Sequence, residues 1–202
     1  MNDIDRFFQT DPAAFASAYL EHVQRTLRRI DADAVGRFLQ ALLDARERGA
    51  TVYFIGNGGS AATASHFAND LAIGVDDYEK PIRAISLADN LALISAVGND
   101  LGFEEIFVRQ LRVLARRGDV VVAISASGNS PNLVKAFEYA KNAGVVTVAL
   151  TAFDGGRLKD MADVSVHVPT GPREYGPAED AHMVLDHLAG NFLMRYVRVV
   201  RA

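Results

Sequence analysis

The spacing of hydrophobic and polar positions along the chain changes at Gly49. Before Gly49, apolar residues recur at intervals of three and four, which predicts two amphipathic helices. Asp31 or Asp33 is placed to cap the second helix, and Gly49 to end it. This pair fits either a helical hairpin packed on the main domain or a subunit interface. The first stripe comprises Phe15, Tyr19, Val23, Leu27 and Ile30, and the second comprises Val35, Phe38, Leu39, Leu42 and Leu43.

After Gly49, short β-branched runs alternate with helical segments. Runs such as VVVAI and VVTVAL are apolar throughout, as in strands that are buried on both faces of a parallel sheet. Helices are predicted after the first and third strands, to about residues 73 and 142, and a long one from Pro177 or Glu179 toward Arg198. We therefore predict an α/β fold with a doubly wound, five-stranded parallel sheet flanked by helices, beside the N-terminal helical pair. The predicted strands are 51–55, 82–86, 119–125, 145–151 and 163–168.

Composition narrows the class of protein. The chain has 202 residues, half of them hydrophobic, which fits one domain over 1–202, with the helical pair at 1–49 and the α/β core at 50–202. There is no cysteine, which excludes disulfides, thiolate zinc sites and cysteine nucleophiles, and fits a cytoplasmic location. The net charge of −4, with no signal-like or membrane-spanning segment, predicts no general partnership with nucleic acid or membrane.

Two glycine- and serine-rich loops follow predicted strands. The first, GNGGSAATAS from Gly56, lets the backbone approach an anion, and Ser60 can cap the next helix and donate its hydroxyl. The second, SASGNS, places Ser125, Ser127 and Ser130 within six residues. Each loop alone also fits a tight strand-to-helix turn. Two such loops on neighbouring strands favour a phosphorylated small molecule held without a net positive charge.

Histidines and carboxylates recur at helical spacing on two segments. His66 and Asp70 are four residues apart, and Glu179 and His187 are eight apart, with His182 and Asp186 nearby. Two histidines and two carboxylates can ligate zinc without any cysteine. The same pattern also fits a buried core histidine and a solvated aspartate, so spacing alone leaves the metal site open.

The motifs together resemble a known family. GNGGSA, HFANDL, VGND, ISASGNS and a final ExxHxxxxH helix are similar, over nearly the whole chain, to the sugar isomerase (SIS) domain family and to its phosphoheptose isomerase branch. The resemblance implies isomerisation of sedoheptulose 7-phosphate to D-glycero-D-manno-heptose 7-phosphate through an enediol. It also implies zinc, no nucleotide cofactor, and a homotetramer with sites at subunit interfaces.

The resemblance also carries site residues onto this chain. It implies zinc ligation by His66, Asp70, Glu179 and His187, with Asp70 and His187 in acid–base work that Glu179 could share or take over. Two departures stand out, because the family usually has Glu at position 70 and Gln at 179, and a third replaces a common threonine hydroxyl by Ala126. The implied substrate-binding positions are Asn57, Gly58, Gly59, Asn99, Asp100, Ser125, Ala126, Ser127 and Ser130, to which the capping argument adds Ser60.

Two other interpretations remain open. The chain could isomerise another ketose phosphate, with the loop TGPREYGP reshaping the pocket, although Arg173 and Tyr175 are interpreted as loop surface. It could also be a non-catalytic SIS protein that senses a phosphosugar or binds a protein partner such as a replication initiator. The last helix favours burial between subunits, because apolar residues cover most of its circumference. These residues are Met183, Leu185, Leu188, Phe192, Leu193, Tyr196 and Val197.

Overall fold

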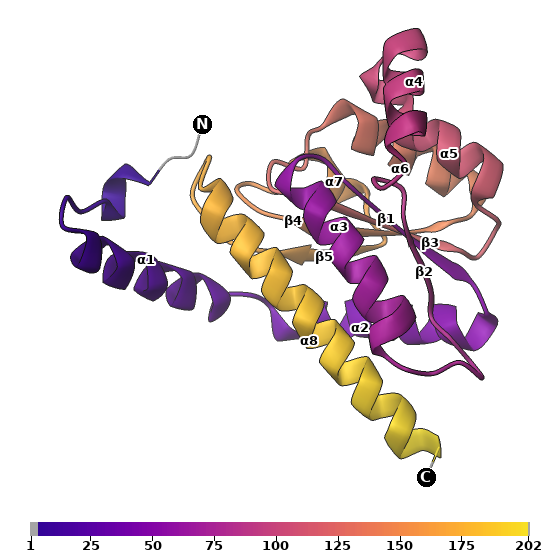
Figure 1. The fold of residues 1–202 in the computed structure, drawn as a ribbon, viewed down its shortest axis with the longest axis horizontal. Helices are drawn as coiled ribbons and strands as arrows, with labels where there is room; N and C mark the ends of the chain where they lie inside the picture. Colours follow the sequence, from indigo (N-terminus) through magenta and orange to yellow (C-terminus); the bar gives the residue numbers. More distant parts are fainter. Residues whose placement is uncertain (1–3, 202) are drawn as a thin grey trace.

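A parallel sheet lies at the centre of the structure, a computed structural model that describes residues 4–201 (Figure 1). Its order is β2-β1-β3-β4-β5, and every neighbouring pair of strands is parallel. The predicted fold class is therefore confirmed, with each predicted run giving one strand. The strands are β1 (Thr51–Gly56), β2 (Arg83–Ser86), β3 (Val120–Ser125), β4 (Val146–Thr151) and β5 (Val164–His167).

Helices cover both faces of the sheet, because side chains alternate between the faces along each strand. Phe54 of β1 packs with Phe38 and Phe67 on one face, whereas Tyr53 and Ile55 belong to the core of the other face. The first face carries α2 (Ala32–Arg48), α3 (Gly59–Asn69) and α8 (Tyr175–Arg201). The second carries α5 (Ile106–Leu114), α6 (Pro131–Ala143) and α7 (Gly156–Met161).

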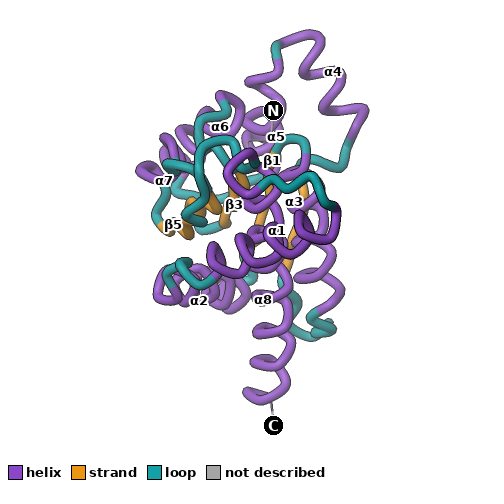
Figure 2. The backbone as a smooth tube through the Cα atoms, turned by 90° about the vertical axis from the view of Figure 1, so that its left-hand side faces the viewer, coloured by secondary structure: helices purple, strands orange, loops and turns teal. Residues whose placement is uncertain are grey.

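The N-terminal helices do not fold back on each other as a hairpin. A short turn η1 (Asp5–Phe7) precedes α1 (Pro12–Leu27), which lies against α8 and extends away from the sheet, whereas α2 packs under the sheet (Figures 1 and 2). Asp11 caps α1 by accepting the Ala14 N–H at 2.7 Å. The only buried residues of α1 are polar, His22 and Thr26. The apolar stripe of this helix is therefore not fully buried by the described residues of the chain.

The segment between β2 and β3 holds helices that the sequence analysis did not predict. They are α4 (Leu91–Leu101), a turn η3 (Phe103–Glu105) and α5. In Figure 1, α4 projects from the upper part of the molecule, and no residue of this apolar helix is buried within residues 4–201. None of the helices in that range is both long and apolar enough to cross a membrane.

Two local features set the candidate site. Helix α3 continues into a π-helical turn, η2 (Asp70–Gly74), a rare geometry that is often found at functional sites. Helix α8 begins at Tyr175, slightly before the predicted start, and runs unbroken to Arg201. The two helices run in the same direction, because Gly59 lies against Glu179 and Gly190 lies against Asp70.

Candidate functional site

The two glycine- and serine-rich loops meet at the carboxyl ends of β1 and β3. These strands are direct neighbours in the sheet, and Gly56 pairs with Ile124 at their ends. The loops are tied together by Asn57 and Asn132, whose amides exchange two hydrogen bonds of 3.0 and 2.8 Å. Neighbouring parallel strands thus bring both loops to one place, as expected for ligand binding in open α/β sheets.

A cavity of about 130 Å³ opens between the loops. Three helices, α3, α6 and α8, begin at its walls, so the partial positive charge of each helix N-terminus lies near it. Free backbone N–H groups and hydroxyls in such a place suit an anion such as phosphate. The cavity is lined by Asn57, Ser60, Ile124, Ser125, Ala126, Ser127, Ser130, Tyr175 and Glu179.

Gly128 shapes the serine loop through its backbone. Its φ is +65°, and a Cβ there would lie only 1.9 Å from the carbonyl oxygen of Gly155. Its N–H donates to the Ser125 hydroxyl at 3.1 Å, which folds the loop over the end of β3. Any side chain would therefore both strain the backbone and collide with the neighbouring loop.

The carboxyl group of Glu179 lies at the N-terminus of α3. A Cβ at Gly59 would lie 2.4 Å from Glu179 Oε2, so the glycine is what permits this close approach. Burial, and then the charge of Asp180, raise the pKa of Glu179. The shift favours the neutral carboxyl, which can donate a hydrogen bond to a phosphate oxygen where a carboxylate would repel it.

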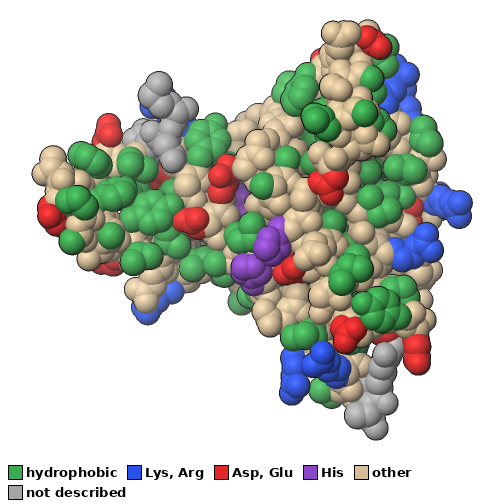
Figure 3. Space-filling view, in the orientation of Figure 1, with side chains coloured by type: hydrophobic (Ala, Val, Ile, Leu, Met, Phe, Trp, Pro, Cys, Tyr) green, Lys and Arg blue, Asp and Glu red, His purple; other side chains and the backbone are tan. Residues whose placement is uncertain are grey.

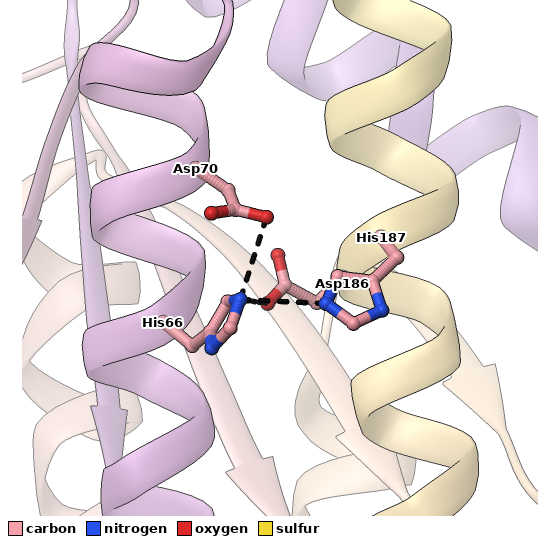
Figure 4. Close-up of side chains that lie close together, drawn as sticks. All are labelled: His66, Asp70, Asp186 and His187. Carbon is pink, nitrogen blue, oxygen red and sulfur yellow. Dashed lines mark hydrogen bonds and ion pairs between the residues drawn. The ribbon is translucent and has the colours of Figure 1, made fainter.

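Further along α3 and α8, four side chains converge on one point (Figure 4). His66 and Asp70 come from α3 and its π-helical turn, and Asp186 and His187 come from α8. His66 Nε2 lies 3.4 Å from His187 Nε2, 3.5 Å from Asp70 Oδ2 and 3.8 Å from Asp186 Oδ2. One ligand atom from each residue lies within 4.8 Å of all the others, an arrangement that suits a metal ion.

Burial differs sharply within this cluster. His66 and His187 are exposed, and Figure 3 shows histidine side chains at the surface near the middle of this face, with an acidic side chain beside them. Asp186 is fully buried, and neither of its oxygens has a hydrogen-bond partner among the described residues. Burial first, and then the charge of Asp70, raise the pKa of Asp186 to about 7, while His187 lowers it.

His182 has a different character. It is fully buried one turn before Asp186 on α8, and burial lowers its pKa to about 4. It is therefore neutral at ordinary pH and is not one of the four clustered side chains. This is the core histidine that the sequence pattern left possible, although at position 182 rather than 66.

Most of the expected site residues lie either at the cavity or in the His/Asp cluster. Gly58 and Gly59 form the backbone turn into α3, with Gly58 at a φ of +54°. Asn99 and Asp100 do not reach the cavity, because they lie exposed near the end of α4 and bond to each other at 2.7 Å. Glu179 lies at the cavity and not in the His/Asp cluster, so its role as a metal ligand stays a prediction.

Two residues were undervalued by the sequence analysis. Tyr175 was interpreted as loop surface, but it lines the cavity, with its ring held edge-on against Phe153 at 5.0 Å. Asp186 was noted only as a residue near the pattern. It is adjacent to His187, and adjacent residues on a helix point about 100° apart, so spacing did not predict that both would face the same point. Its signal was a charged residue among the apolar positions that recur along the buried side of α8.

The fold and its two hydroxyl-bearing loops define an α/β domain with a cavity suited to an anion such as phosphate. The chain belongs to the SIS domain family, whose model matches residues 18–152.

Relatives within the family cover most of the chain. It is 33% identical over 181 residues to a phosphoheptose isomerase of Helicobacter pylori, which covers 89% of this chain and 92% of the relative. It is 38% identical over 156 residues to a phosphoheptose isomerase of Trichlorobacter lovleyi, covering 76% and 78%. A solved phosphoheptose isomerase structure from Neisseria gonorrhoeae superposes with a TM-score of 0.80 at 31% identity, covering 88% of this chain and 96% of that one.

Proposed function

We propose that this protein is a phosphoheptose isomerase, an aldose–ketose isomerase that converts sedoheptulose 7-phosphate to D-glycero-D-manno-heptose 7-phosphate through an enediol. The observation that carries the proposal is the placement of an anion-suited cavity and a histidine/carboxylate cluster along the same two helices. Relatives that bear this activity in their names cover up to 89% of the chain. The fold alone would not assign an activity, because one fold hosts many functions.

The cavity is assigned to the phosphate end of the sugar. Three helix N-termini and several hydroxyls supply donors there without a net positive charge, which fits an acidic protein that binds an anion. Holding the phosphate fixes which carbon atoms reach the acid–base groups. The proposed substrate-binding residues are Asn57, Gly58, Gly59, Ser60, Asn99, Asp100, Ser125, Ala126, Ser127 and Ser130.

His66, Asp70 and His187 are assigned to a zinc ion. The donor set fits, because zinc accepts imidazole nitrogens and carboxylate oxygens, and these three offer such atoms within one cluster. When bound, zinc would supply Lewis-acid polarisation of the carbonyl and hydroxyl oxygens of the sugar. No nucleotide cofactor is required for this reaction type, since the hydrogen moves between neighbouring carbons of one substrate.

Proton transfer is assigned to residues of the two helices. A base removes a proton from the carbon next to the carbonyl, and an acid protonates the carbonyl oxygen, which gives the enediol. Asp70 is the candidate base and His187 the candidate acid or base, since both lie in the cluster and are accessible. Glu179 is a further candidate, because burial favours its neutral form and so suits it to give a proton.

The active unit is proposed to be a homotetramer with sites at subunit interfaces. On α8, apolar side chains four residues apart form a stripe, and each is between 37% and 42% exposed. The apolar helix α4, which carries Asn99 and Asp100, is also uncovered within residues 4–201. A second chain packed on these faces would bury both and could receive the two polar residues. The stripe comprises Val184, Leu188, Phe192 and Tyr196.

This assembly has a direct test. Light scattering at micromolar protein should give the mass of a tetramer, and Leu188→Asp should shift it to a smaller species by placing a charge in the stripe that the assembly would bury. Wild-type protein that is purely monomeric at that concentration would contradict the assembly. A cytoplasmic location, without nucleic-acid or membrane partners, is proposed with it and fits the absence of cysteine.

The activity is tested by a turnover screen over seven-carbon and six-carbon ketose phosphates, with and without added zinc. Turnover of sedoheptulose 7-phosphate should exceed that of the others and should fall sharply in both Asp70→Asn and His187→Ala. Full turnover by both variants would contradict the assignment. Preference for a six-carbon substrate would instead favour the second candidate, isomerisation of another ketose phosphate, which the missing hydroxyl at Ala126 and the presence of Tyr175 in the cavity support.

A further inference from the structure

A second cavity, of about 270 Å³, lies against α1 and outside the site described above. We call it the basic cavity, because three of its lining residues are arginines and none of the described residues that line it is acidic. The arginines come from the turn η1, from α1 and from the turn that follows α1. This local excess of positive charge stands out in a chain whose net charge is −4. The lining residues are Arg6, Phe7, His22, Arg25, Thr26 and Arg29.

Glu174 fixes one side of the basic cavity without lining it. This residue is 2% exposed and directly precedes α8. Its carboxylate accepts a hydrogen bond from the Gly171 N–H at 2.8 Å, lies 3.0 Å from His22 Nε2 and forms an ion pair with Arg6. One buried carboxylate thus compensates one of the three guanidinium groups and orients the buried His22 ring.

The other two arginines retain donors for a ligand. Arg25 pairs with Glu21 on the same helix, and both side chains are more than half exposed, so this ion pair contributes little stability. Arg29 donates one hydrogen bond, to the Pro169 carbonyl oxygen at 3.2 Å. Because a guanidinium group carries five N–H donors and binds phosphate oxygens two at a time, most of this capacity is unused. Thr26, which is 2% exposed, adds a hydroxyl-bearing side chain to the lining.

Stabilisation of α1 alone does not account for the arrangement. Basic residues at a helix C-terminus interact favourably with the helix dipole, and this would explain Arg25 and Arg28 equally well. Arg28, however, is exposed and does not line the basic cavity. Arg6 belongs to a separate element and is held there by the buried Glu174. Two elements and a buried carboxylate therefore direct positive charge to one cavity.

The basic cavity is joined to the cavity between the two loops through residues 169–174. Arg29 bonds to the backbone at the first residue of this segment, and Arg6 pairs with Glu174 at its last residue. The next residue, Tyr175, begins α8 and lines the cavity between the loops. A ligand that binds these arginines would therefore change how the segment is held, and so bias the position of Tyr175.

We propose that the basic cavity binds a phosphate-bearing small molecule other than the substrate, and that this binding is coupled to the cavity between the loops. Arginines are the residues best suited to bind phosphate groups. The Phe7 ring stacks on His22 with ring centroids 4.6 Å apart and is only 7% exposed, so it offers little surface to an aromatic base. Only the coupling to turnover rests on the proposed function.

Protection against arginine modification tests the site in wild-type protein, without reference to turnover. Full-length protein is treated with phenylglyoxal with and without inorganic phosphate, and mass spectrometry gives the labelling rate of each arginine. At phosphate about ten times its dissociation constant, Arg25 and Arg29 should be labelled about tenfold more slowly, because mass action leaves few sites unbound. The matched control, Arg28, should be labelled at nearly the same rate in both conditions.

A double variant separates the basic cavity from the cavity between the loops. Inorganic phosphate should inhibit wild-type turnover in a mixed pattern, because it competes with the substrate in one cavity and changes kcat through the other. In Arg25→Gln/Arg29→Gln the change in kcat should vanish while the competition remains, and Arg28→Gln should behave as wild type. All three arginines are exposed, so the variants should fold, which thermal unfolding verifies.

Two results would overturn the site: no protection of Arg25 and Arg29 by phosphate, or equal protection of Arg28. Purely competitive inhibition of the wild-type protein would overturn the coupling. Failure of the proposed function gives a different pattern. Protein that turns over no ketose phosphate, yet shows protection of Arg25 and Arg29 alone, would keep the basic cavity as an anion site and remove the isomerase activity.

Discussion

The two centres between α3 and α8 are built in opposite ways. The cavity uses backbone and hydroxyl groups at the starts of three helices, and its one carboxyl, Glu179, is shifted toward its neutral form. The cluster uses charged or chargeable side chains on helix faces farther along. The first therefore suits an anion and the second a cation, although the same two helices form both. Helix ends can bind by backbone charge, whereas interior turns depend on side chains.

The largest expected effect separates chemistry from phosphate binding. Asp70→Asn removes the charge of the cluster carboxylate, and kcat should fall by about 10²- to 10⁴-fold, the usual contribution of an acid–base group. Inorganic phosphate should bind the variant as it binds wild type, because the cavity residue Ser60 is about three helical turns away from Asp70. Steady-state kinetics measures kcat, and calorimetric titration measures the affinity for inorganic phosphate. An equal loss in kcat and in phosphate affinity would contradict the separation of the cavity from the His/Asp cluster.

The next effect tests whether the cavity depends on its backbone. Gly128→Ala places a Cβ 1.9 Å from the Gly155 carbonyl oxygen at a φ of +65°, and should destabilise the fold by at least about 2 kcal/mol. Asp70→Asn should leave the thermal unfolding midpoint nearly unchanged by comparison. Gly36→Ala is the control, because it lies within α2 with open space around it and should be neutral or stabilising. Equal midpoints for the two glycine variants would show that the loop has other ways to fold.

The fold was predictable where pattern and topology agree. Continuous apolar runs such as 120–124 indicate a parallel sheet because only strands buried on both faces tolerate them. Helix α4 was missed because its apolar residues do not alternate with polar ones at helical spacing. None of its residues is buried within residues 4–201, so the rest of the described chain does not account for its apolar character. Of the two arrangements that the sequence left open for α1 and α2, the hairpin is not formed, and the sequence could not decide between them because periodicity defines a helical face but not what covers it.

The cavity was easier to predict than the cluster. Its residues are contiguous in two loops, and strand adjacency brings those loops together. The cluster needs two helices to pack at one particular register, which spacing within a helix does not specify. The spacing found His66, Asp70 and His187, but it favoured Glu179 and passed over Asp186, because only packing decides which turn of α8 faces the π-helical turn.

A smaller effect is expected from a single hydroxyl of the cavity. Ser130 precedes α6 and lines the cavity, and its side chain makes no capping hydrogen bond, so its hydroxyl is available to phosphate. Ser130→Ala should raise KM about tenfold with kcat little changed, since a hydrogen bond to a charged group is worth about 1.5 kcal/mol or more. Ser95→Ala on α4 is the control, because that hydroxyl bonds to the Ala92 carbonyl. A fall in kcat alone would place Ser130 in the chemistry instead.

The smallest effect concerns the charge of Glu179 and depends on pH. Burial raises the pKa of this carboxyl, so it is neutral at low pH and becomes a carboxylate as the pH rises through that raised value. Phosphate binding to wild type should therefore weaken with rising pH relative to Glu179→Gln, by about three- to tenfold, since one partly exposed charge contributes about 1 kcal/mol.

The ratio of wild-type to Glu179→Gln affinity isolates this effect, because the ionisation of phosphate itself is common to both proteins. Stability should follow the same sign. A raised pKa means that the stability tied to the neutral carboxyl is present at low pH and is lost as the pH rises, so the thermal midpoint of Glu179→Gln should gain on wild type with increasing pH. A ratio that does not change with pH would mean that the Glu179 charge does not act on the anion, and the cavity would then owe its preference to helix ends and hydroxyls alone.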